Sequence, residues 1–226
     1  MKYKDVVKYS NDFYIYHIGK FLLLRGKIIT DASDYLSFGI KFKNKVVLDI
    51  GAWSGDSILL FHKLGAKRII AYEPIKENVE FAKKIIKKFN IYCKIHPYAV
   101  CKENGMKDFI IEEEKYGRAD LSLFENKITK SRKIKIRCIS WENVLKKAIK
   151  EKVDIAKVDC EGCERFLLDA NEELIKQIPE WIIESHGYET FLELSRKFIK
   201  NGYKLIKIVP FDLHRDNFIV ILHFKL

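Results

Sequence analysis

Short apolar segments alternate with amphipathic segments over most of the chain from residue 45 onward. The apolar segments are residues 46–50, 68–72, 92–96, 153–158 and 180–184. Strands that are apolar throughout are usually covered on both faces, so we expect these five to form a parallel sheet between layers of helices. The pattern therefore predicts an α/β fold.

The segments between these strands have the spacing of amphipathic helices. In residues 78–89 the apolar positions recur along one face, and four lysines lie on the other. Residues 57–64 and 189–200 are predicted as further helices, because Gly65 and Asn201-Gly202 are typical C-terminal signals.

Three further pairs of short segments are predicted to be strands. They are residues 13–18 with 21–24, 108–111 with 133–139, and 203–209 with 218–224. The first pair, separated by Gly19-Lys20, is expected to form an N-terminal hairpin. The second flanks a loop with Tyr116, Gly117 and Arg118, and we interpret it as an insertion on the main sheet. The third leaves no room for a helix between its strands, so it should pair antiparallel at one edge of the sheet.

The composition is that of a folded protein. The chain has 226 residues, 48% of them apolar, and a formal net charge of +11, which fits one large domain and excludes a disordered chain. No apolar run approaches the roughly 18 residues that span a bilayer, and residues 1–9 are polar and basic, so we expect a soluble, cytoplasmic protein. The Lys/Ile/Glu-rich composition is typical of thermophiles. The positive charge favours an anionic partner, such as RNA or a phosphorylated substrate.

The five cysteines do not form a regular pattern, which argues against a secreted disulfide framework. Cys160 and Cys163 have C-x-x-C spacing, but no second pair completes a zinc site. We expect these two to be small buried residues rather than thiol nucleophiles, and Cys93, Cys101 and Cys138 to pack in strands.

The first candidate site is the loop after the first strand, where Gly51 and Gly55 precede a helix. Such a loop lies at the carboxyl end of the strand, where open α/β sheets bind ligands. Trp53 replaces the third-position glycine of the dinucleotide fingerprint, and a pyrophosphate would be repelled by Asp49 and Asp56. The loop therefore favours a nucleoside without phosphates that has a cationic amino-acid tail. The predicted ligand-binding residues are Asp49, Gly51, Ala52, Trp53, Ser54, Gly55, Asp56 and Ser57.

The second candidate is Glu73-Pro74 at the end of the second strand. A carboxylate there can accept hydrogen bonds from both hydroxyls of a ribose. The alternative is a surface glutamate before a proline turn. Pro97, Tyr98 and Ala99 follow the third strand and are placed to contact an adenine, although ordinary packing at a strand end explains them equally well.

Several motifs occur together and in order along the chain. They are Asp49-Ile50-Gly51-Ala52 with Gly55, Tyr72-Glu73-Pro74, Ala99-Val100, Lys157-Val158-Asp159-Cys160-Glu161-Gly162-Cys163-Glu164, Pro179-Glu180-Trp181-Ile182-Ile183-Glu184-Ser185-His186, Gly202-Tyr203 and Asp216-Asn217-Phe218. Over about residues 46 to 224 the sequence thus resembles the FkbM family of S-adenosylmethionine-dependent methyltransferases. The resemblance implies the class I methyltransferase (Rossmann-like) fold, a seven-stranded sheet with an antiparallel last strand. It also implies S-adenosyl-L-methionine as cofactor and methyl transfer to a hydroxyl of a sugar, a lipid-linked glycan or another small molecule. In one departure, Trp53 stands where the family usually has Asn.

The third candidate follows the fourth strand. Alternation along the strand would put Asp159 and Glu161 on one side and Cys160 on the other. Asp159 could hold the methionine amine of the cofactor or the acceptor, and Glu161 could act as base or orient the acceptor hydroxyl. Alternatively, Glu161 and Glu164 are acids at a helix N-terminus, which is the interpretation that we favour for Glu164.

The fourth candidate is at the end of the fifth strand, where Glu184 and His186 should face the same side. His186 is the first choice for general base, because histidine exchanges protons near neutral pH. Together with Asp159 and Glu161, these residues could also hold a divalent ion. We favour a site without metal, since carboxylates near a sulfonium cation need no metal to explain them.

Two other functions stay open. An RNA methyltransferase would explain the basic charge, but the fourth strand lacks the Asn-Pro-Pro-aromatic type of sequence that many amino-directed base methyltransferases have. A non-catalytic protein that binds S-adenosylmethionine would not need four ionisable groups at one crevice. Residues 115–137 contain eight basic and two acidic side chains, which are either a rim that recruits an anionic acceptor or a solvated face.

The predicted organisation is one methyltransferase domain over residues 1–226. It comprises an N-terminal hairpin or cap (1–44), a cofactor-binding half (45–106), inserted strands (107–139) and a catalytic half (140–226).

Overall fold

The structure is a computed structural model that describes residues 6–10, 13–18, 21–24, 27–28, 38–113, 119–122, 131–214 and 217–226. The chain forms two compact units, Met1–Lys41 and Phe42–Leu226. The first unit is a four-stranded antiparallel sheet of β1 (Val6–Ser10), β2 (Phe13–Ile18), β3 (Phe21–Leu24) and β4 (Lys27–Ile28). The pairing of β2 with β3 confirms the predicted hairpin.

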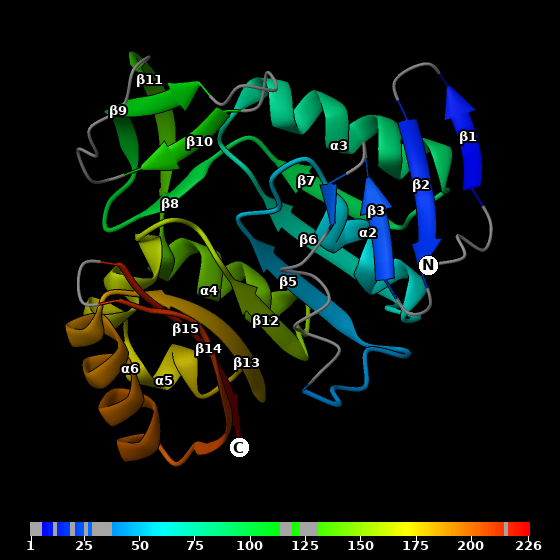
Figure 1. Cartoon of the computed structure of the whole chain (residues 1–226). Helices are drawn as coiled ribbons and strands as arrows, with labels where there is room; N and C mark the ends of the chain where they lie inside the picture. Colours follow the sequence, from blue (N-terminus) through cyan, green and yellow to red (C-terminus); the bar gives the residue numbers. More distant parts are fainter. Residues whose placement is uncertain are drawn as a thin grey trace. The chain divides into compact units, whose positions relative to one another are not determined.

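The second unit is built on a seven-stranded sheet (Figure 1). From one edge to the other its strands are β14 (Lys204–His214), β15 (Asn217–Lys225), β13 (Glu180–His186), β12 (Ile155–Val158), β5 (Val46–Ile50), β6 (Arg68–Tyr72) and β7 (Cys93–His96). Pairing from β13 to β7 is parallel, and β15 runs antiparallel to both of its neighbours. The predicted parallel region and the antiparallel hairpin are therefore confirmed.

The order of the strands places a switch point in the middle of this sheet. From β5 the chain adds β6 and β7 on one side, and later β12 and β13 on the other. At such a reversal the loops from neighbouring strands diverge and leave a crevice at the carboxyl ends of the strands, where open α/β sheets bind ligands. The ends of β5, β6, β12 and β13 therefore define the place to look for a site.

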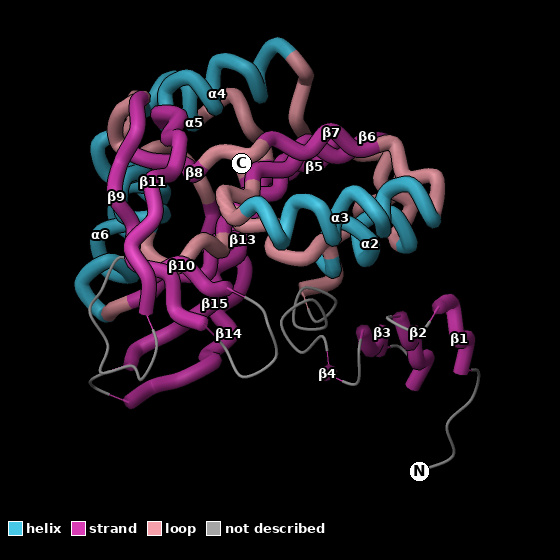
Figure 2. Tube along the Cα trace, turned by 90° about the horizontal axis from the view of Figure 1, so that it is seen from above, coloured by secondary structure: helices cyan, strands magenta, loops and turns pink. Residues whose placement is uncertain are grey.

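Helices cover both faces of the sheet. They are α2 (Asp56–Lys63), α3 (Lys76–Lys88), α4 (Trp141–Lys150), the 3₁₀ helix η1 (Cys163–Asp169), α5 (Glu172–Ile175) and α6 (Tyr188–Lys200). Figure 2 shows α2 and α3 on one side of β5 to β7 and α4 on the other. The apolar faces of α4 and α6 join the main hydrophobic core, with Trp141 and Phe198 among its largest buried side chains. Among the helices of the described segments, none is long and apolar enough to cross a membrane.

A separate sheet replaces the predicted insertion on the main sheet. It consists of β10 (Ala119–Ser122), β9 (Gly105–Glu113), β11 (Ser131–Ser140) and β8 (Ala99–Cys101), in that order. The prediction was wrong in its attachment, because β11 pairs with β8 and not with an edge of the main sheet. Residues 115–118, which include the predicted loop, and residues 123–130 of the basic stretch lie outside the described residues, and the rest of that stretch lies in β10 and β11.

Four of the five cysteines form disulfides, Cys101 with Cys138 and Cys160 with Cys163. The sequence left the pairing of the cysteines open, and the fold brings the paired Cα atoms to 5.7 and 5.5 Å, a separation that a disulfide can span. Cys101 and Cys138 lie in strands β8 and β11, as predicted. Cys101 and Cys138 meet only through the parallel pairing of β8 with β11, which the spacing in the sequence does not reveal. Cys93 is a free cysteine.

Candidate active site

The loop after β5, residues 51–55, is called the glycine loop here, and it is held against the ends of two neighbouring strands. The backbone N–H groups of Gly51 and Ala52 donate to the carbonyl oxygen of Tyr72 in β6, at 3.0 and 3.1 Å. Gly51 has a φ of +78°, and a Cβ atom there would overlap the backbone oxygen of Asp159. Glycine is therefore required for the loop to approach the segment after β12.

Replacing Gly51 by alanine is expected to lower the free energy of unfolding by about 3 kcal/mol or more, because an unfavourable φ is combined with a backbone overlap. Gly65→Ala is the matched control: its φ is +86°, but the added Cβ would lie 3.4 Å from Lys43, an ordinary contact. The control should lose only about 1–2 kcal/mol. Urea unfolding of both variants checks the difference, and equal losses would contradict the assigned overlap.

The remaining predicted loop residues lead directly into α2. The backbone of Gly55 passes Ala82 of α3 so closely that a Cβ would lie 2.9 Å from the Ala82 side chain. Ser54 and Ser57 are buried. Burial raises the pKa of Asp56, the first residue of α2, to about 6. The structure thus gathers all eight predicted loop residues between the end of β5 and the first turn of α2.

Asp49 and Lys157 form a buried ion pair between β5 and β12. Lys157 Nζ lies 3.3 Å from Asp49 Oδ1 and 3.3 Å from Asp159 Oδ2, and it donates to the carbonyl oxygen of Gly51 at 2.8 Å. Asp49 also accepts a hydrogen bond from the Ser57 hydroxyl at 2.6 Å. Burial raises the pKa of Asp49, and Lys157 partly offsets that rise. Burial would lower the pKa of Lys157, but the surrounding aspartates outweigh it and raise the pKa.

Lys157 is a site residue that the sequence analysis did not single out. The signal was present, because a lysine interrupts the otherwise apolar strand β12. A strand covered on both faces tolerates a lysine only when it is paired. Lys157 therefore links the glycine loop to the acidic segment after β12.

Glu73 lies at the end of β6 and is hydrogen-bonded to the glycine loop. Its Oε2 accepts from the backbone N–H of Trp53 at 2.9 Å, and its Oε1 accepts from the backbone N–H of Ile75 at 3.0 Å and from Asn78 Nδ2 at 3.2 Å. Trp53 reaches this position with a φ of +44°. Burial raises the pKa of Glu73 to about 7, although the hydrogen bonds lower it. Glu73 is therefore buried against the loop after β5, and the interpretation as a surface glutamate is wrong.

The predicted adenine-contacting residues follow β7. Pro97 and Tyr98 connect β7 to β8, and Ala99 is the first residue of β8 in the second sheet. The carbonyl oxygen of His96, just before them, accepts from the backbone N–H of Glu73 at 3.1 Å. This segment is therefore adjacent to Glu73. Its contact with adenine stays a prediction.

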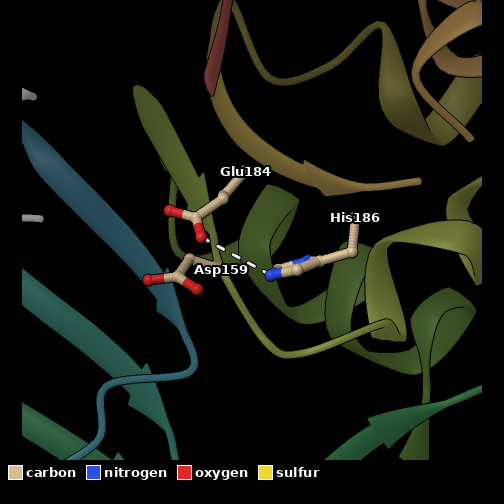
Figure 3. A group of neighbouring side chains, drawn as sticks. All are labelled: Asp159, Glu184 and His186. Carbon is tan, nitrogen blue, oxygen red and sulfur yellow. Dashed lines mark ion pairs between the residues drawn. The ribbon is translucent and has the colours of Figure 1, made fainter. Parts of the chain in front are cut away.

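A second group of side chains lies at the ends of β12 and β13 (Figure 3). Asp159, Glu184 and His186 each present one ligand atom within 4.8 Å of the others. His186 Nε2 is 3.5 Å from Glu184 Oε1, which confirms that these two residues face the same side. The structure thus brings Asp159 together with Glu184 and His186, which follow it by 25 and 27 positions in the sequence.

Glu164 orients His186 within this group. The carboxylate is fully buried at 0% exposure, and its Oε1 lies 3.1 Å from both the backbone nitrogen and Nδ1 of His186. Its Oε2 accepts from the backbone N–H of Gly162 at 2.9 Å. Glu164 lies in the first turn of η1, as predicted for an acid at a helix N-terminus. That interpretation does not include its contact with His186. That contact was hidden because it joins residues 22 positions apart.

The ionisation of His186 is set by its neighbours. Burial lowers its pKa, but hydrogen bonds to Glu164 and Glu184 and the charges around them raise it to about 11. A protonated imidazole cannot accept a further proton. The assignment of His186 as general base stays a prediction, and it requires that His186 first lose its proton.

Glu161 lies beside His186, but not for the reason that was predicted. Strand β12 ends at Val158 and Glu161 has a φ of +54°, so alternation along a strand does not govern its direction. Its Oε2 nevertheless lies 3.5 Å from His186 Nε2. Loss of hydration raises the pKa of Glu161 to about 7, while 54% of its side chain stays exposed. An exposed carboxylate with such a pKa suits proton exchange with a bound molecule.

Several solved methyltransferase structures share this fold. The FkbM methyltransferase from Methylobacillus flagellatus has a TM-score of 0.56 and 15% identity, with 82% of this chain and 45% of that chain covered. A proposed RNA methyltransferase from Pyrococcus horikoshii has a TM-score of 0.50 and 17% identity, with 86% of this chain and 82% of that chain covered. Magnesium protoporphyrin IX methyltransferase from Synechocystis was solved with bound S-adenosylmethionine. It has a TM-score of 0.50 and 9% identity, with 87% of this chain and 76% of that chain covered. These similarities define the class I methyltransferase fold.

The FkbM methyltransferase domain matches residues 49–205, more than half of the chain. The chain therefore belongs to the FkbM methyltransferase family, and it is an S-adenosylmethionine-dependent methyltransferase. It spans less than half the length of the solved FkbM structure. No curated protein has a significantly similar sequence.

The residues of the crevice fit S-adenosylmethionine. Glu73 is a buried acid beside the glycine loop, where a ribose would offer two hydroxyl donors. Asp159 is partly exposed, with 22% of its side chain accessible, and it could pair with the cofactor's amine. These carboxylates are groups that can accept hydrogen bonds from hydroxyls and pair with positive charge.

Proposed function

We propose that this methyltransferase methylates a hydroxyl group of a sugar, a lipid-linked glycan or another small molecule in the cytoplasm. The main support is the group of Asp159, Glu161, Glu184 and His186 beside the glycine loop. A hydroxyl must lose its proton as it is methylated, and this group supplies acceptors for that proton. The strands β8 to β11 are candidates for shaping the acceptor site.

The proposed roles follow from position in the crevice. Glu73 accepts hydrogen bonds from the ribose hydroxyls, and Asp159 binds the methionine amine. S-adenosylmethionine supplies an electrophilic methyl group on its sulfonium. Most of the rate enhancement comes from holding the acceptor oxygen in line with the methyl carbon. Glu161 removes the hydroxyl proton, which adds about 10²- to 10⁴-fold.

The proposal is tested by the destination of the methyl group. Methyl-labelled S-adenosylmethionine is incubated with the full chain and a cell extract, and carbohydrate, lipid and RNA fractions are then counted. We expect the label in the carbohydrate or lipid fraction. Label in RNA alone would replace the proposal with RNA methylation, and label in no fraction would leave a protein that binds the cofactor without catalysis.

Glu161→Gln is expected to lower methyl transfer by about 100-fold or more while leaving the affinity for S-adenosylmethionine nearly unchanged. The control is Glu142→Gln, since Glu142 is an exposed glutamate paired with Lys146 on α4. Steady-state rates with the labelled cofactor measure the effect. If the two variants had equal rates, Glu161 would not be the base.

A further inference from the structure

The side chains of Asp159, Glu184 and His186 have the spacing of ligands to a single metal ion (Figure 3). Their nearest ligand atoms all lie within 4.8 Å of one another. Divalent cations bind oxygen and nitrogen ligands at about 2.0–2.6 Å, so two ligands of one ion are separated by at most about 4–5 Å. The three ligand atoms therefore need little movement to surround one cation.

The orientation of His186 is a second, independent indication. Its Nδ1 is 3.1 Å from the fully buried Glu164, which directs Nε2 into the cluster. Nε2 is itself buried and faces oxygens of Glu161 and Glu184, each at 3.5 Å. Metal-binding histidines are typically held in this way, with the other ring nitrogen fixed by a carboxylate.

The charge of the cluster also favours a cation. Carboxylates of Glu161, Glu164 and Glu184 converge on one imidazole. Asp159 adds a fourth carboxylate, and the neighbouring cation Lys157 is shared between Asp159 and Asp49. Like charges at these distances repel one another, and a divalent cation would offset that repulsion.

We propose that Asp159, Glu184 and His186 bind a divalent cation of the Mn²⁺ or Mg²⁺ class, with Glu164 as a positioning residue. The two carboxylates are ligands of the kind that Mn²⁺ and Mg²⁺ prefer, and the imidazole favours Mn²⁺ of these two. This differs from the metal-free site that the sequence favoured, because the sequence does not show the convergence of three ligand atoms or the contact between Glu164 and His186.

The inference rests on the proposed function and changes one role in it, because Asp159 binds the cation in place of the methionine amine. It also supplies a route for the proton. A hydroxyl bound to the cation has a lowered pKa, and its proton passes to the Glu161 carboxylate. The oxygen then uses its electron pair to form the bond to the methyl carbon. The carbon–sulfur bond breaks with its electrons going to sulfur, which leaves the methyl ether and S-adenosylhomocysteine.

Binding of Mn²⁺ to the full chain without cofactor or acceptor tests this site directly. The free Mn²⁺ signal in electron paramagnetic resonance should fall until one ion is bound per chain. Spin-echo modulation of the bound ion should show coupling to one imidazole nitrogen. That signature uses the unmodified protein, so it does not depend on whether a variant folds.

Variants then assign the ligands. Glu184→Gln and His186→Gln should each weaken Mn²⁺ binding by about 100-fold or more, and Glu164→Gln by about 10- to 100-fold with the nitrogen coupling retained. Glu180→Gln is the matched control: Glu180 lies at the other end of β13 and pairs with His223 at 2.7 Å. Its Mn²⁺ affinity should equal that of the unmodified chain.

The inference would be overturned by a folded chain that binds no Mn²⁺, by bound Mn²⁺ without nitrogen coupling, or by equal affinities in Glu184→Gln and Glu180→Gln. In those cases the protonated His186 alone would balance the carboxylates. Methyl transfer without Mn²⁺ binding would reject the metal site and keep the proposed function. Mn²⁺ binding without methyl transfer to any acceptor would keep the metal site and reject the proposed function.

Discussion

Replacing Glu73 by glutamine is expected to weaken the binding of S-adenosylmethionine by about 100-fold or more. Two ribose hydroxyls that donate to one buried carboxylate form charge-assisted hydrogen bonds, each of which contributes about 1.5–3 kcal/mol. Titration followed by tryptophan fluorescence measures the loss. Glu80→Gln is the control, because Glu80 is an exposed residue of α3 that pairs only with Lys83 among the contacts described. If both variants bound the cofactor alike, Glu73 would not contact the ribose.

The same substitution should also make stability depend less on pH. Burial raises the pKa of Glu73 from about 4.5 to about 7. The folded chain thus holds a proton that the unfolded chain has lost between these two values. Stability therefore falls as pH rises through this window. Between pH 5 and pH 8 the free energy of unfolding of Glu73→Gln should therefore rise by on the order of 2–3 kcal/mol relative to that of the unmodified protein. Urea unfolding at the two pH values measures this change. If the difference in free energy of unfolding between Glu73→Gln and the unmodified protein were the same at both pH values, the raised pKa of Glu73 would be contradicted.

Replacing Lys157 by methionine is expected to lower the free energy of unfolding by about 3–5 kcal/mol. The substitution leaves Asp49, which is 0% exposed, as a buried charge without its cation. Methionine keeps much of the volume of the side chain, so the loss reports on charge rather than on a cavity. The glycine loop should also lose its link to the end of β12, because Lys157 donates to the Gly51 carbonyl oxygen.

Lys45→Met is the matched control for that result. Lys45 pairs with Asp154 at 3.0 Å near the start of the same two strands, but the two side chains are 42% and 32% exposed. Exposed pairs contribute about 1 kcal/mol or less. Urea unfolding of both variants gives the comparison. Equal losses at the two ends of β5 and β12 would show that the burial of the Lys157 pair adds nothing.

The main sheet could be predicted from the sequence because its central strands are apolar on both faces. Residues 46–50 and 68–72 match β5 and β6 at both ends. The loop after β5 was equally predictable, since Gly51 and Gly55 each occupy a backbone position with positive φ and a close neighbour. The apolar strands and the positive φ of the two glycines are local features, so the sequence displays them directly, whereas the close neighbours come from distant segments.

The parts that could not be predicted depend on contacts between distant segments. Alternation failed for Glu161 because β12 ends three residues earlier and the chain turns. Glu164 contacts His186 only because η1 packs beside β13. The disulfide between Cys101 and Cys138 depends on the second sheet, whose strands were interpreted as an extension of the first.

The central claim is that the crevice at the ends of β5, β6 and β12 binds the cofactor, and calorimetric titration with S-adenosylmethionine tests it most directly. We expect one molecule bound per chain, with the heat of binding lost in Glu73→Gln and retained in Glu80→Gln. An unmodified, folded chain that gives no heat of binding, or a Glu73→Gln chain that binds with unchanged affinity, would contradict it.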